Sequence, residues 1–191
     1  PVLARVERGI AGGVASGPVS FMRIFDTATE QIKQGGRRRG ANMGVLDATH
    51  PDIEAFVAAK ESTDVFRNFN LSVATDGAFW EAYEADTAYE IVNPRSDEVV
   101  RRADPAKLLG RIAEMAWRTG DPGVLFLDTI NRGNPTPHLG RIEATNPCGE
   151  VPLLPHEACL LGSINLGEHT DGSTVEWESL RDTVHLAVRA L

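Results

Sequence analysis

Short, largely apolar runs of residues alternate along this chain with segments of helical periodicity. The runs lie at residues 42–46, 69–73, 124–130 and 160–166, and each has the length of a strand. Strands that are near-continuously apolar are typical of parallel sheets, because helices cover both faces of such sheets. The alternation therefore predicts an α/β fold that is built on a largely parallel sheet or barrel.

Proline and glycine residues set the ends of the predicted helices. Pro18 opens an amphipathic segment that continues to Gly35, and Pro105 opens another that ends at Gly120. Proline is favoured in the first turn of a helix and glycine just after its last turn, so both segments are predicted to be helical. Other expected elements are helices at residues 51–60, 76–85 and 175–191, and a hairpin at residues 89–100.

The charge of the chain narrows its class of partners. The formal net charge is −8 over 191 residues, whereas general binders of nucleic acid or of membrane surfaces need a basic field. The chain also lacks both an apolar run of the roughly 18 residues that span a membrane and a signal-peptide pattern. We therefore predict a cytoplasmic protein with no nucleic-acid partner and no membrane contact.

The sequence at both ends of the chain indicates that the chain is a piece of a longer protein. The chain begins at Pro1 rather than at a methionine, and its last helical segment stops on the apolar Leu191 without a stop signal. We expect residues 1–191 to be one fragment of a single domain that is truncated at both ends.

Common site motifs do not fit the chain. The glycine-rich residues 9–17 match neither the dinucleotide fingerprint nor the phosphate-binding loop of nucleotide hydrolases, and a flexible loop is the simpler interpretation. Cys148 and Cys159 are spaced too far apart for a zinc knuckle, and Val151 stands where a zinc deaminase needs its second cysteine. No metal site is predicted, and no disulfide is expected between these cysteines in a cytosolic chain.

Cys148 lies in a polar turn, Asn146-Pro147-Cys148-Gly149-Glu150. Pro147 stiffens the backbone before the thiol, and Gly149 leaves room beside it. The Asn146 amide can donate and accept hydrogen bonds, the Glu150 carboxylate can move a proton, and the sulfur can act as a nucleophile or a radical carrier. This set suits a substrate rich in hydroxyl groups, although the turn alone is equally consistent with a buried and inert thiol.

The amino-acid sequence around this turn resembles that of a known family. Residues 146–166, "NPCGEVPLLPHEACLLGSINL", resemble the active-site segment of the ribonucleotide reductase catalytic chain, and are closest to its adenosylcobalamin-dependent (class II) branch. Further blocks of the chain resemble that family in the family's order, and these lie at residues 12–46, 50–60, 69–73 and 126–137.

The resemblance implies roles for the residues of the turn. Cys148 would form the thiyl radical that removes the 3′-hydrogen of the ribose, and Glu150 would take the proton of the 3′-hydroxyl group. Asn146 would orient the sugar through its amide. Pro147 and Gly149 would line the site of the ribonucleotide substrate.

The second cysteine also has a position in the family. Cys159 matches one member of the redox pair that delivers two electrons while the 2′-hydroxyl group leaves as water. The resemblance places the other member upstream of Pro1. It also implies a thioredoxin-like reductant, adenosylcobalamin as the cofactor, and a homodimer for the full-length protein.

The fold implied by the resemblance is part of a ten-stranded α/β barrel with Cys148 on a central finger loop. The resemblance also implies a specificity loop that binds a deoxynucleotide or ATP effector. That loop would contain Gly12, Gly13, Val14, Ala15, Ser16 and Gly17. The same residues could instead serve only to turn the chain into the helix that begins at Pro18.

Other classes of function stay open. One alternative is a class I catalytic subunit that draws its radical from a separate protein, although its known chains usually carry another residue at the position of Pro147. A second is a non-catalytic homologue that binds nucleotides, which the joint presence of Asn146, Cys148, Glu150 and Cys159 disfavours. A glycyl-radical enzyme with a related barrel is a more remote alternative, because such chains lack the sequence of this finger loop.

Overall fold

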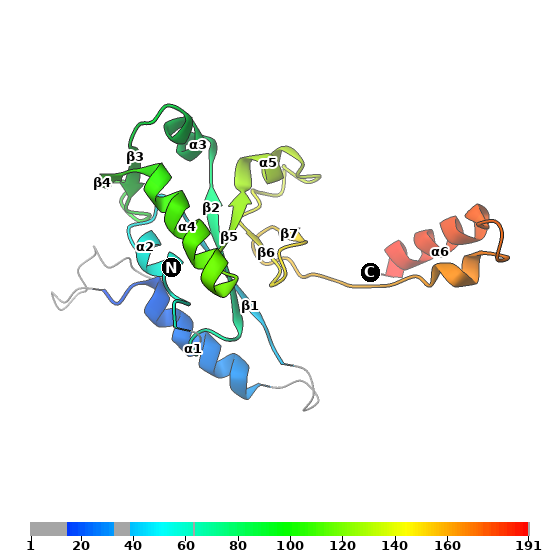
Figure 1. The fold of residues 1–191 in the computed structure, drawn as a ribbon. Helices are drawn as coiled ribbons and strands as arrows, with labels where there is room; N and C mark the ends of the chain where they lie inside the picture. The colour runs from blue at the N-terminus through cyan, green and yellow to red at the C-terminus, as the bar shows by residue number, and fades with distance from the viewer. Residues whose placement is uncertain (1–14, 33–38, 63, 191) are drawn as a thin grey trace. The chain divides into compact units, whose positions relative to one another are not determined.

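The computed structural model describes residues 15–32, 39–62 and 64–190 (Figure 1). The chain divides into two compact units, Pro1–Pro155 and His156–Leu191. Each unit is therefore described by itself.

A parallel three-stranded sheet forms the centre of the first unit. Its strands are β1 (Asn42–Asp47), β2 (Phe69–Thr75) and β5 (Gly123–Phe126), in the order β1-β2-β5. In the register, Asn42 pairs with Phe69 and Ser72 pairs with Gly123. The prediction of a parallel sheet is thereby confirmed for these strands.

Helices cover one face of this sheet. Figure 1 shows α4 crossing the sheet, with α2 beside α4 and α1 below them. The helices of this unit are α1 (Pro18–Gln31), α2 (Ile53–Val57), α3 (Gly77–Glu84), α4 (Pro105–Thr119) and α5 (Leu127–Arg132). One hydrophobic core joins Leu71 and Val73 of β2 to side chains of α1 to α4, among them Met22, Phe56, Phe79 and Met115.

Side chains alternate between the two faces of β2. Because Leu71 and Val73 point into the core, Asn70 and Ser72 point to the opposite face of the sheet. That opposite face is the one that concerns the candidate site below.

Local sequence signals explain the ends of α3 and α4. The Asp104 carboxylate accepts hydrogen bonds from the backbone N–H groups of Ala106 and Lys107, and Asp76 accepts one from Phe79. Such caps pair N–H groups that have no partner within the helix. α4 ends at Gly120, whose φ of +86° lies in the left-handed region that favours glycine.

The predicted hairpin is confirmed. β3 (Tyr89–Val92) and β4 (Val99–Ala103) pair antiparallel around the Asn93-Pro94 turn. The Tyr89 hydroxyl group donates a hydrogen bond to the backbone oxygen of Ala48 and so attaches the hairpin to the end of β1.

Three predicted elements differ from the structure. The apolar run at residues 124–130 is a strand only to Phe126, and the helix at residues 51–60 is limited to α2. The Asn131 side chain explains the first difference. It bonds the backbone of Leu127 and, through both amide atoms, the backbone of Ile142, which holds the end of the run as the helical turn α5. After α2, Lys60 leaves the helical path to bond Phe69 and Asp121.

The third difference lies in the second unit, where residues 160–166 were predicted to form a strand. No strand forms there, and Leu160 and Leu161 are 59% and 80% exposed. An apolar run becomes a strand only when another strand pairs with it, and the described residues of this unit provide none. The unit contains the short helix η1 (Leu166–His169) and the predicted C-terminal helix, α6 (Trp177–Ala190).

The fold class is mixed α/β, and the described strands do not close into a barrel. They form the three-stranded sheet, the β3-β4 hairpin and a second hairpin of β6 (Ala144–Thr145) and β7 (Pro152–Leu153). Among the described residues, no helix is both long enough and apolar enough to span a membrane.

Candidate active site

The predicted active-site turn is the loop of the β6-β7 hairpin. Ala144 pairs with Leu153 and Thr145 pairs with Pro152, so residues 146–151 are left as the loop. The ladder is short, and the loop must therefore be held by further bonds.

The Asn146 residue closes the loop. Its backbone N–H donates to the oxygen of Val151 at 3.1 Å, and its side-chain Oδ1 accepts from the N–H of Val151 at 3.0 Å. Its backbone oxygen accepts from Gly149 N–H at 3.0 Å. Gly149 has a φ of +86°, which a residue with a side chain adopts only at a cost, so glycine suits the position after the cysteine.

The reactive side chains of the turn face outward. Cys148 is an exposed free thiol, and Glu150 is also exposed. The Asn146 Oδ1 is occupied by Val151, but its Nδ2 has no hydrogen-bond partner among the described residues and can donate to a bound molecule. The structure thus brings Asn146, Cys148 and Glu150 together on one six-residue loop.

A side chain from the sheet also contacts this turn, and the sequence analysis missed it. Asn70 Nδ2 donates to the backbone oxygen of Pro147 at 2.5 Å. This bond joins β2 to a residue 77 positions later in the chain. The available signal was the amide side chain of Asn70 within the run "FNLSV", where it alternates with apolar residues.

A partly buried ion pair bonds the backbone of the two residues that flank Asn70. Lys60 Nζ lies 2.5 Å from Asp121 Oδ2, and the two side chains are 17% and 15% exposed. Lys60 also donates to the oxygen of Phe69 at 2.6 Å, while Asp121 Oδ1 accepts from Leu71 N–H at 2.9 Å. The pair therefore holds the backbone on both sides of Asn70.

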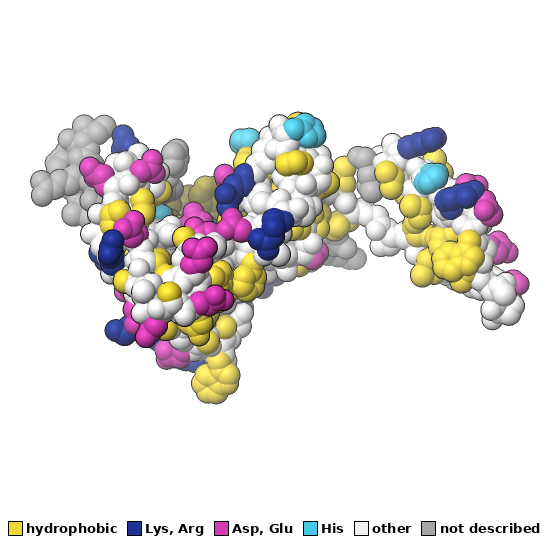
Figure 2. Space-filling view, turned by 90° about the horizontal axis from the view of Figure 1, so that it is seen from above, with side chains coloured by type: hydrophobic (Ala, Val, Ile, Leu, Met, Phe, Trp, Pro, Cys, Tyr) yellow, Lys and Arg dark blue, Asp and Glu magenta, His cyan; other side chains and the backbone are white. Residues whose placement is uncertain are grey.

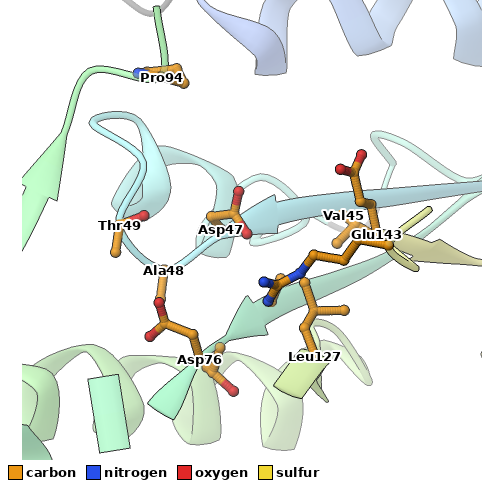
Figure 3. A pocket seen from close by; sticks show the side chains of 11 residues that line it. Val45, Asp47, Ala48, Thr49, Asp76, Pro94, Leu127 and Glu143 are labelled. Carbon is orange, nitrogen blue, oxygen red and sulfur yellow. The ribbon is translucent and has the colours of Figure 1, made fainter. Parts of the chain in front are cut away.

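A cavity of about 670 Å³ lies at the carboxyl ends of β1 and β2 (Figure 3). Ligands commonly bind at this edge of parallel sheets. Acidic side chains gather around it, and Figure 3 shows Asp47, Asp76 and Glu143 there. Arg141, which also lines the cavity, bonds Asp128 at 2.8 Å, and Asp128 accepts a hydrogen bond from Gly77 N–H.

Burial is the main cause that raises the pKa of Asp47 above its ordinary value of 3.8. The residue also keeps an exposed surface, so solvent screening limits the size of this shift. The nearby carboxylates of Asp76 and Glu143 raise the pKa further, while His50 and Arg141 lower it. The charged form of Asp47 is therefore disfavoured in the folded state.

Asp47→Asn is expected to raise the stability of the folded protein at pH 7. A raised pKa means that the folded state holds the Asp47 proton more tightly, so ionisation of Asp47 costs stability as the pH rises above 3.8. Asparagine removes that cost, and its advantage should shrink as the pH falls toward 3.8. Thermal unfolding of the full-length parent protein from pH 4 to pH 7 measures both effects, with Asp97→Asn in the hairpin turn as the control. A parent protein more stable at pH 7 than Asp47→Asn would contradict this interpretation.

The predicted specificity loop is only partly described. Gly12, Gly13 and Val14 lie outside the described residues. Ser16 and Gly17 precede α1, where their backbone oxygens accept hydrogen bonds from the Ser20 hydroxyl group at 3.1 Å and 2.9 Å. Gly17 has a φ of +78° and ends the non-helical segment. These contacts lie at the start of α1, and Ala15 directly precedes them in the chain.

Cys159 lies in the second unit, where it is half-buried and a free thiol. The structure thus keeps the three residues of the turn together and assigns Cys159 to a separate unit. Within the described residues, no group of three or more His, Cys, Asp or Glu side chains is arranged to hold a metal ion.

Charged side chains are mixed on the surface. On the face in Figure 2, Lys and Arg side chains are scattered among Asp and Glu side chains rather than gathered in one area. Elsewhere in the described residues, charged side chains pair, as Arg39 does with Glu30 and Arg102 with Glu90. Among the described residues on this face, Lys and Arg side chains thus do not gather into a basic surface of the kind that binds nucleic-acid backbones.

Comparison with known proteins connects the turn to a family. The family model described as "Ribonucleotide reductase, barrel domain" matches residues 7–191. A vitamin B12-dependent ribonucleoside-diphosphate reductase of Thermoplasma acidophilum is 50% identical over 185 residues, which cover 96% of this chain and 24% of that protein. One from Mycobacterium tuberculosis (strain CDC 1551 / Oshkosh) is 54% identical over 181 residues, covering 94% of this chain and 26% of that protein.

A more distant relative agrees with these two. A vitamin B12-dependent ribonucleotide reductase of Streptomyces clavuligerus is 37% identical over 180 residues, which cover 82% of this chain and 19% of that protein. The chain therefore spans about a quarter of the length of its more similar curated relatives. Because the family model covers almost the whole chain, including the Cys148 turn, the chain belongs to the ribonucleotide reductase family and carries sequence of its barrel domain.

Proposed function

We propose that the protein containing this chain reduces ribonucleotides to 2′-deoxyribonucleotides by thiyl-radical chemistry and so supplies precursors of DNA. The observation that carries the proposal is the turn on which an exposed thiol, an exposed carboxylate and an amide donor lie together at Cys148, Glu150 and Asn146. The names of the relatives, which are reductases of ribonucleotides, support the same reaction.

Each side chain of the turn has a step in this proposal. The Cys148 sulfur takes the hydrogen atom from C3′ of the ribose, which forms the S–H bond and leaves a radical on the sugar. Glu150 takes the proton of the 3′-hydroxyl group, a role that needs an accessible carboxylate. The Asn146 Nδ2 donates to the sugar, because Oδ1 of the same amide is held by Val151.

The two-electron reduction needs a dithiol in addition to the turn. The 2′-hydroxyl group leaves as water, and two thiols supply two electrons and two protons while they become a disulfide. We assign Cys159 as one of these thiols, since it is free and only half-buried. A thioredoxin-like protein would then return the disulfide to the dithiol.

Adenosylcobalamin is the cofactor that we propose, in keeping with the names of the relatives. The Cys148 thiol fits such a large group because it lies exposed at the end of a hairpin. When bound, the cofactor supplies the one-electron chemistry that converts this thiol to a thiyl radical. Pro147 and Gly149 would shape the substrate site around the thiol.

The fold and the remaining partners complete the proposal. The parallel sheet would be part of a ten-stranded barrel that other segments of the protein complete, with the β6-β7 hairpin as its central finger. Residues 12–17 would belong to the loop that binds a deoxynucleotide or ATP effector. We place the full-length protein in the cytoplasm as a homodimer.

The test is formation of deoxyribonucleotides by the full-length protein under anaerobic conditions with a dithiol reductant. We expect product with adenosylcobalamin and none without it, and chromatography of the nucleotides measures both. Product that requires a separate metal-bearing subunit would instead indicate a class I enzyme. A protein that binds nucleotides but forms no product under either condition would be a non-catalytic homologue.

A further inference from the structure

The bond from Asn70 to Pro147 differs in kind from the other bonds of the active-site turn. The bonds between Asn146 and Val151 and between Asn146 and Gly149 lie within the loop and fix its shape. They do not fix the loop relative to the sheet. The 2.5 Å bond from Asn70 Nδ2 does so, because its donor belongs to β2.

The acceptor of this bond is the carbonyl group immediately before the cysteine. The carbonyl of Pro147 and the N–H of Cys148 belong to one planar peptide group. A donor that holds the Pro147 oxygen therefore restrains the peptide plane that leads into the Cys148 Cα, and the hydrogen bond from Gly149 N–H to the Asn146 oxygen limits rotation beyond that plane. The direction of the thiol is thereby linked to a side chain of the sheet.

The backbone around Asn70 is itself held by hydrogen bonds to two side chains. The oxygen of Phe69 accepts a hydrogen bond from Lys60, and the N–H of Leu71 donates to Asp121, so the residues on both sides of Asn70 are bound. The Lys60–Asp121 ion pair joins these two bonds. The Asn70 backbone thus has a defined position from which its amide can reach the turn.

We propose that Asn70 is a positioning residue that holds the Cys148 thiol in its reacting direction through the Pro147 carbonyl. The inference rests on the proposed function, because it assigns Asn70 to the reaction for which Cys148 is the radical carrier. Asn70 acts through the peptide group and not on the substrate. Hydrogen-atom transfer depends steeply on the distance and direction of the reacting atoms, so a loosened thiol lowers the rate of the chemical step more than substrate binding.

The test compares Asn70→Leu and Asn70→Ala with the control Ser72→Ala in the full-length protein. Leucine has a similar size but no donor, and alanine tests the same loss without added bulk. Ser72 lies on the same strand and the same face, and its side chain makes no hydrogen bond to the turn. In both Asn70 variants kcat should fall about 10-fold to 100-fold while KM stays within about twofold, and Ser72→Ala should match the parent.

A second readout does not depend on activity. Hydrogen exchange at the amides of Asn146, Gly149 and Val151, whose hydrogen bonds close the loop, should become about fivefold faster or more in both Asn70 variants, because a loop that is no longer bound to β2 opens more often, and should stay unchanged in Ser72→Ala. Unchanged exchange in the Asn70 variants would overturn the inference. Hydrogen exchange tests the role of Asn70 even if the protein reduces no ribonucleotides. A failure of the proposed function can therefore be told apart from a failure of this inference.

Discussion

Cys148→Ser in the full-length protein is expected to lower deoxyribonucleotide formation by at least about 10⁴-fold, the order of loss seen when an enzyme loses the atom that performs its chemistry. A serine O–H bond is much stronger than a cysteine S–H bond, so the hydroxyl group cannot take over as the radical carrier. Cys148 is exposed, and serine should therefore occupy the turn without disturbing the core. Anaerobic product formation with adenosylcobalamin and a dithiol measures the loss.

The unfolding temperature of Cys148→Ser provides the control for this experiment. It should equal that of the parent, because neither the hydrogen bonds of Asn146 nor the β6-β7 ladder uses the thiol. Activity in the serine variant above about one hundredth of the parent rate would remove Cys148 from the reaction and return it to the interpretation as an inert thiol.

Asp121→Asn is expected to destabilise the full-length protein by about 3 kcal/mol, as is typical when one partner of a buried ion pair is lost. The substitution preserves shape and an acceptor for Leu71 N–H, but it leaves the charge of Lys60 largely buried beside the Phe69 oxygen. Urea denaturation, followed by a probe that reports on the first unit, measures the change in the free energy of unfolding.

Two further variants separate the ion pair from charge effects in general. Glu90→Gln breaks the exposed pair with Arg102 and should change stability very little, since water screens surface pairs. Lys60→Met combined with Asp121→Asn should cost less than the two single changes added together, because no unpaired buried charge remains. If Asp121→Asn unfolded at the urea concentration of the parent, the pair would have no structural role.

The parallel sheet and most helices of this fold follow from the sequence because their signals are local. Pro105, Asp104 and Gly120 define the two ends of α4 without reference to the rest of the chain. The errors occur where distant contacts decide the outcome. The apolar run after Phe126 turns into α5 because Asn131 bonds Ile142, and the run at residues 160–166 has no strand to pair with.

The same difference between local signals and distant contacts applies to the residues of the candidate site. Asn146, Cys148 and Glu150 are recognisable because they stand close together in the chain and resemble a family segment. Asn70 is separated from the turn by 77 positions, and Lys60 from Asp121 by 61, so their contacts exist only after the chain has folded. An amide side chain in a largely apolar run stands out in the sequence, but the sequence does not identify its partner.

The bonds of Asn146 restrict what evolution can place at that position. One half of its side-chain amide builds the loop by accepting from Val151, and in the proposed function the other half donates to the sugar. Aspartate could accept but not donate, glutamine is one methylene too long for the same loop, and serine has a shorter reach. Shape and chemistry are thus encoded in one residue, so drift at this position would have to preserve both at once, which leaves it almost no neutral substitutions.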